Sequence, residues 1–87
     1  MRFDGPSEPG IEAFRRRART EDGRELVTLR GIRLGDRWLV ECEVRPHGAE
    51  DEAPIRPGPY VFLTERAARS FADEATLALE YLGCEIS

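Results

Sequence analysis

The chain has no long hydrophobic run and few of the residues that most often perform chemistry. No segment approaches the ~18 consecutive apolar residues of a membrane-spanning helix, and no apolar segment follows Arg2. We therefore expect a cytoplasmic protein without membrane association. Histidine occurs once, and no C-x-x-C pair, H-E-x-x-H motif or glycine-rich phosphate loop is present. We expect no enzyme, no cofactor and no metal site.

Lysine is absent, so all thirteen basic residues are arginine, against seventeen acidic residues. The net charge of -4 argues against non-specific binding of nucleic acid. Apolar residues make up 40% and charged residues 34% of the 87 residues, which is typical of one globular domain with a charged surface. The two cysteines, Cys42 and Cys84, fit reduced thiols in a cytosolic chain, although the sequence also allows a disulfide between them.

Proline and glycine are concentrated in two segments. Residues 1–10 are predicted to be a flexible lead-in, and residues 46–59 a loop longer than the about 4–6 residues of a usual connection. Residues 11–87 are expected to form a single α+β domain. His47 lies in the loop beside acidic residues 50–52, which suggests either a metal site or a solvated loop. We favour the solvated loop, because no rigid element fixes ligand geometry there.

The clearest structural signal is a hairpin. The apolar-rich segments Leu26–Leu34 and Arg37–Arg45 flank Gly35-Asp36, which suits a two-residue turn. This turn places Leu29 opposite Cys42 on one face and Arg30 opposite Glu41 on the other. The predicted core residues of the second strand are Trp38, Val40, Cys42 and Val44.

Residues 11–20 are ambiguous. As a helix, Ile11, Phe14 and Ala18 share one stripe; as a strand, the segment joins the hairpin through the turn residues Asp22-Gly23. We favour the strand, because it lays the Phe14 ring over Gly31. The same register has a cost, since it puts Arg16 on the core face and Arg15 opposite Arg30.

The C-terminal third predicts a short strand over Tyr60–Leu63 and then a helix. Thr64 is the expected N-cap, and Gly83 is expected to end the helix after about Leu82. Residues 84–86 fit a short terminal strand. The predicted fold is therefore α+β: an antiparallel meander of three or four strands with one C-terminal helix packed on one face. The helix residues expected to face the sheet are Ala68, Phe71, Ala72, Ala75, Ala78, Leu79 and Leu82.

Two apolar groups fall outside this core and indicate interaction surfaces. Ile32, Leu34 and Leu39 lie on the sheet face opposite the core, whereas Leu77 and Tyr81 form an i, i+4 pair away from the core face of the helix. Either group suits a protein partner or a second subunit. The sequence thus predicts a small non-catalytic interaction or regulatory module that binds a protein partner or forms a homodimer.

An arginine cluster supports a different interpretation, in which the domain binds nucleic acid through phosphate contacts. An arginine-rich edge strand protected against aggregation would give the same pattern. The cluster consists of Arg15, Arg16, Arg17 and Arg19, joined by Arg30 on the next segment.

Two segments, 37–41 (RWLVE) and 62–69 (FLTERAAR) followed by Ala75 and Leu77, resemble parts of the AP2-type DNA-binding domain. The resemblance implies a three-stranded sheet followed by one helix, with the sheet in the DNA major groove. This chain departs from that pattern in carrying Glu41 and Glu43 on the outer sheet face and in its longer loop at 46–59.

Overall fold

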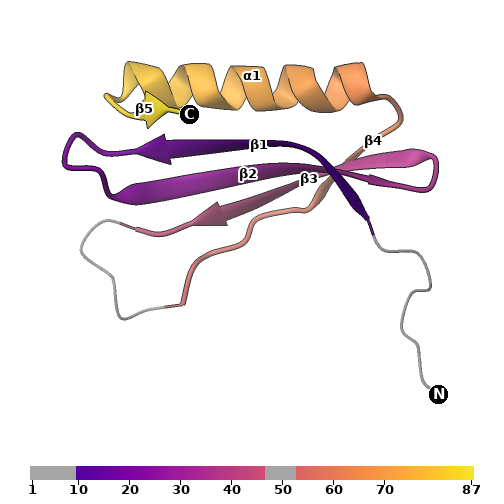
Figure 1. Ribbon diagram of the computed structural model, residues 1–87, viewed down its shortest axis with the longest axis horizontal. Coiled ribbons are helices and arrows are strands. Elements are labelled where there is room, and N and C mark those ends of the chain that lie inside the picture. The colour runs from indigo at the N-terminus through magenta and orange to yellow at the C-terminus, as the bar shows by residue number, and fades with distance from the viewer. Residues whose placement is uncertain (1–9, 47–52) are drawn as a thin grey trace.

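The computed structural model describes residues 10–46 and 53–87, which form one antiparallel sheet with a helix on one side (Figure 1). The predicted α+β class is confirmed. The sheet has five strands in the order β4-β3-β2-β1-β5, because both short C-terminal segments join it. The elements are β1 (Ile11–Arg19), β2 (Glu25–Leu34), β3 (Arg37–Val44), β4 (Tyr60–Phe62), α1 (Glu65–Tyr81) and β5 (Glu85–Ile86).

The β2–β3 hairpin has the predicted register throughout. Leu29 pairs with Cys42, and Arg30 pairs with Glu41. Gly35 adopts a positive φ of 63° at the turn, a conformation that glycine reaches without steric cost. Because alternate residues of a strand point to opposite faces, this register places the apolar set of β3 on one side and its carboxylates on the other.

Residues 11–19 form a strand, so the preferred interpretation is correct and the helical alternative is wrong. Phe14 pairs with Gly31, and its ring fills the space that a Cβ on Gly31 would need. The two expected costs of this register are offset, since Glu12 accepts a hydrogen bond from both Arg15 and Arg30 and Arg16 has partners of its own. Arg16 forms an ion pair of 2.7 Å with Asp73 of α1, and its guanidinium lies 5.3 Å from the Phe14 ring centroid.

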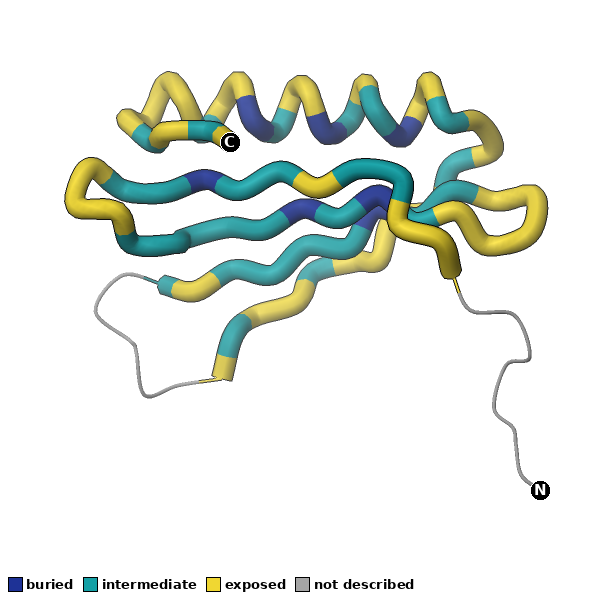
Figure 2. Tube along the Cα trace, in the orientation of Figure 1, coloured by how far each residue is buried: buried dark blue, intermediate teal, exposed yellow. Residues whose placement is uncertain are grey.

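The helix begins and ends where the sequence predicts. The side chain of Thr64 accepts a hydrogen bond of 3.1 Å from the amide of Ala67, and Gly83 follows the C-cap with a φ of 97°. Ala68 and Ala72 are fully buried and form one cluster with Val40 of the sheet. The buried positions of α1 lie on its side that faces the sheet (Figure 2). These small side chains let the helix backbone lie close to the strands.

The predicted core face of the helix is wrong in its last turn. Ala78 and Leu82 are exposed, whereas Thr76 is buried. The helix packs through Ala68, Ala72 and Thr76, spaced four residues apart, and this stripe turns gradually away from the predicted one. The Thr76 hydroxyl donates a hydrogen bond of 3.0 Å to the Asp73 carbonyl, so its burial leaves no unpaired donor.

Short strands form both edges of the sheet. On one edge β5 pairs with Ala18 and Arg19 of β1. On the other edge β4 pairs with β3, and Ile55 forms an isolated bridge with Val44 inside the segment predicted to be a loop. Residues 1–9 of the predicted lead-in 1–10 and residues 47–52 of the predicted loop, which include His47, lie outside the described residues. No helix in the described ranges is long and apolar enough to cross a membrane.

Candidate functional site: the open face of the sheet

The helix lies on one face of the sheet, and no described helix packs on the other face, which we call the open face (Figure 1). Its side chains come from alternate strand positions and form cross-strand rows. We name three rows in order of their distance from the β2–β3 turn. The apolar row consists of Glu12, Ile32, Leu39 and Val61, the middle row of Arg15, Arg30 and Glu41, and the distal row of Arg17, Thr28 and Glu43.

The apolar row brings predicted interface residues together. Ile32 pairs with Leu39, Leu39 pairs with Val61, and Leu34 follows Ile32 on the same face of β2. Val61 is 60% exposed and Leu34 is 37% exposed, whereas Ile32 and Leu39 are half-buried. Gly10 lies against the Ile32 side chain, where a Cβ would collide with it, and so covers part of the row.

Val61 could not be assigned to this face from the sequence, because a three-residue strand shows too little alternation to distinguish its two faces. Its pairing with Leu39 supplies the assignment. The neighbouring Phe62 points to the covered side, where its ring centroid lies 5.5 Å from that of Phe71. Alternation then places Val61 on the open face.

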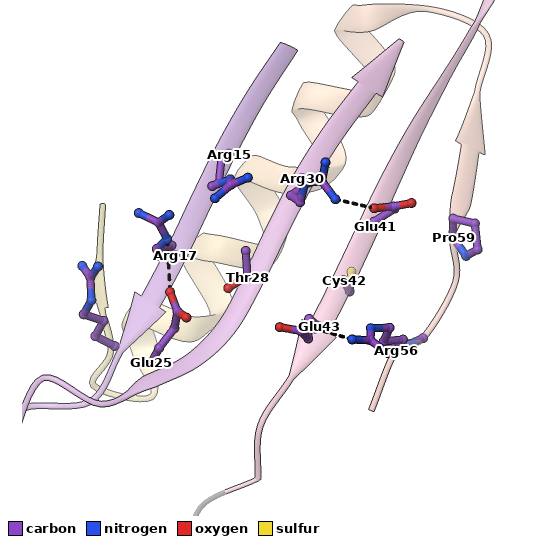
Figure 3. A pocket seen from close by; sticks show the side chains of 12 residues that line it. Arg15, Arg17, Glu25, Thr28, Arg30, Glu41, Cys42, Glu43, Arg56 and Pro59 are labelled. Atoms are coloured by element: carbon purple, nitrogen blue, oxygen red, sulfur yellow. Dashed lines mark hydrogen bonds and ion pairs between the residues drawn. The ribbon is translucent and has the colours of Figure 1, made fainter. Parts of the chain in front are cut away.

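The middle and distal rows form a network of ion pairs around a depression of about 570 Å³. Figure 3 shows these side chains with α1 behind the sheet. Arg30 lies 3.0 Å from Glu41, and Arg56 lies 2.8 Å from Glu43. The charged residues that line the depression are Arg15, Arg17, Arg19, Glu25, Arg30, Glu41, Glu43 and Arg56.

Hydrogen bonds from arginine lower the pKa of two carboxyl groups of this face, those of Glu12 and Glu43. Glu12 accepts bonds of 2.9 Å from both Arg15 and Arg30, and these bonds lower its pKa, with Arg15 contributing more. The bond from Arg56 likewise lowers the pKa of Glu43. Five arginines and three glutamates line the depression, so it is locally positive on a chain of net charge -4.

The predicted arginine cluster does not form one surface. Arg15, Arg17, Arg19 and Arg30 all line the depression, but Arg16 points to the opposite side, where it pairs with α1. The reason is the twofold alternation of a strand, which separates consecutive arginines onto two faces.

The two helix candidates lie apart from the open face. Leu77 is 54% exposed and Tyr81 is 85% exposed, on the side of α1 away from the sheet, and Leu82 is exposed beside them. The helix layer therefore separates the two predicted apolar groups, and they cannot act as one surface.

Within residues 10–46 and 53–87, no group of three or more histidine, cysteine, aspartate or glutamate side chains is placed to hold a metal ion. Cys42 and Cys84 are free thiols. Burial raises the pKa of Cys42, so its thiol stays protonated at neutral pH and is a poor nucleophile.

We found no match to this chain among protein-family models, curated proteins or solved structures. The AP2 resemblance therefore has no support beyond the segments that suggested it. The fold also differs from the three-stranded sheet followed by one helix that it implies, since the described sheet has five strands and β5 follows the helix.

Proposed function

We propose that the protein is a non-catalytic interaction module that binds another protein through the open face of its sheet. The observation that carries this proposal is the apolar row. Ile32, Leu39 and Val61 stand side by side across three strands on a face that no described helix covers. A sheet normally buries an apolar stripe against another layer, so this row is suited to contact with a partner.

The charged rows beside it suit a protein partner better than a membrane or a small substrate. Protein interfaces commonly combine an apolar centre with a polar rim and are enriched in arginine. Here Arg30 is held by Glu12 and Glu41, so its guanidinium has a fixed position before any partner arrives. Fixed charges of both signs select partners by matching and by repulsion.

Paired charge variants of the two apolar surfaces test this proposal. Ile32→Glu with Leu39→Glu should abolish association while the circular dichroism spectrum stays native. Leu77→Glu with Tyr81→Glu, on the helix, is the matched control and should keep association. Association of the purified protein is measured by light scattering. Affinity capture with a tagged copy, in a lysate that also contains an untagged copy, measures association with that copy and with other proteins. Equal association of the wild type and the sheet variant would contradict the proposal.

Nucleic-acid binding is a second candidate, favoured by the four arginines of β1 and β2 that line one locally positive depression. Carboxylates compete for these groups, since Arg17 pairs with Glu25 and Arg15 with Glu12. Binding through phosphates would weaken steeply with salt. Titration of labelled DNA and RNA at two salt concentrations decides the matter, and an absence of binding at low salt removes this candidate.

A further inference from the structure

Charge is distributed unevenly across the open face, and this asymmetry indicates which partner the face fits. In the middle row, Arg15 stands on β1 and Glu41 stands on β3, on either side of Arg30. The distal row repeats the order, with Arg17 on β1 and Glu43 on β3. In these two rows, therefore, β1 carries arginines and β3 carries carboxylates.

Two copies of such a face are complementary in one of two simple face-to-face arrangements. A twofold axis across the strands at the middle row would place β1 on β1 and so bring Arg15 onto Arg15. An axis parallel to the strands places β1 of one copy on β3 of the other. In that arrangement Arg15 meets the carboxylate of Glu41, and this contact occurs twice because the interface is isologous.

We propose that the partner of the open face is a second copy of this chain, related by a twofold axis parallel to the strands and held by reciprocal Arg15–Glu41 contacts. This inference rests on the proposed function, because it names the partner of the same face. Packed sheets normally lie within about 30° of parallel, which this arrangement allows.

The local contacts fit the reciprocal pairing. A guanidinium has five N–H donors, so Arg15 can keep its bond to Glu12 and hold a second carboxylate. Glu41 is the more accessible acceptor of β3, since Glu43 is bridged by both Arg45 and Arg56. The side chain of Glu41 is 45% exposed and that of Arg15 is 40% exposed.

Of the apolar row, only Ile32 lies at the axis, whereas Leu39 faces Glu12 of the second copy. Ile32 and Arg30 lie on β2, the strand between β1 and β3, so each lies near its own symmetry mate. Contact of Ile32 with Ile32 buries apolar surface. The two Arg30 side chains repel less than free cations would, because each is already bridged by Glu12 and Glu41.

Charge reversal and its compensation test the arrangement by sedimentation equilibrium of the purified protein. The wild type should dimerise, and Arg15→Glu and Glu41→Arg should each weaken the dimer at least about tenfold, since each change affects two contacts. The double variant should recover most of the loss, because the swapped charges again face each other. Arg66→Glu on the exposed side of α1 is the control and should leave the dimer unchanged.

Milder variants keep the test valid if a reversal disturbs folding. Arg15→Gln and Glu41→Gln should each reduce the salt dependence of dimerisation. A wild-type dimer that is insensitive to all of these changes would overturn the proposed arrangement. A monomeric wild type would overturn self-association, whereas the proposed function would stand if a different captured protein is lost from the Ile32→Glu, Leu39→Glu variant.

Discussion

The two faces of one sheet are built from alternate residues of the same strands and have opposite properties. On the covered face Leu29 and Val40 are buried against Ala68 and Ala72 of α1. On the open face the charged rows remain accessible and pair among themselves. We expect the covered face to supply most of the stability of the fold, which leaves the open face available for the binding that we propose.

The first prediction compares substitutions at two neighbouring residues of β2, one on each face of the sheet. Leu29→Ala should lower the free energy of unfolding by about 2–5 kcal/mol, because it leaves a cavity beneath the helix. Thr28→Ala, on the open face, should change it by less than about 0.5 kcal/mol. Urea denaturation at neutral pH measures both. Similar losses for the two variants would contradict the division of labour between the faces.

The second prediction concerns the close approach of Phe14 to Gly31 on the covered face. Gly31→Ala should cost about 1–3 kcal/mol, because the new methyl group occupies the position of the ring. Phe14→Leu in the same chain should relieve part of this cost, so the two changes should not be additive. Thermal unfolding of the two single variants and the double variant gives the coupling, and strict additivity would rule out the contact.

The third prediction tests the start of the helix that covers the sheet. Thr64→Ala should cost about 1 kcal/mol, because the amide of Ala67 loses its acceptor. Ser70→Ala, at an exposed position within α1, is the control and should be neutral or slightly stabilising. Chemical denaturation followed by circular dichroism compares them, and equal effects would exclude a capping role for Thr64.

The smallest effect is expected from acid on the open face. The pKa values of Glu12 and Glu43 are lowered in the fold, first by the bonds from Arg15 and Arg56 respectively. Such groups stabilise the fold above their ordinary pKa of 4.5, and this contribution disappears as the pH falls through the lowered values.

Thermal unfolding midpoints from neutral pH into the acid range measure this effect. The midpoint should hold above the ordinary carboxyl pKa and decline below it. Glu12→Gln with Glu43→Gln should make that decline shallower. An identical acid profile for the wild type and this variant would show that the ion pairs of Glu12 and Glu43 contribute nothing to stability.

Much of the sheet could be predicted because its signals are local. The Gly35-Asp36 turn sets the β2–β3 register, and the alternation of β3 then assigns its faces. The β1 register over residues 14–18 followed in the same way from Asp22-Gly23, but irregularities at both ends of β1 shift the pairing there by one residue, so that Glu12 pairs with Ile32. The open-face positions of Ile32, Leu34 and Leu39 depend on these local signals.

The missed features depend on contacts between distant segments. The exposure of Leu82 depends on how α1 lies over the sheet, and an amphipathic pattern of many alanines leaves that rotation poorly determined. The ion pair of Arg16 with Asp73 joins β1 to α1 and compensates a position that looked unfavourable in the sequence. The placement of Val61 likewise required the pairing of β4 with β3.

The most direct test of the open face as the binding surface is a dilution series of isotope-labelled protein followed by amide NMR. Our account predicts concentration-dependent shifts at Thr28, Arg30, Leu39 and Glu41, with Leu77 and Tyr81 unchanged. Shifts confined to Leu77, Tyr81 and their neighbours would place the interface on the helix and contradict the account. Spectra that do not change with concentration would contradict self-association.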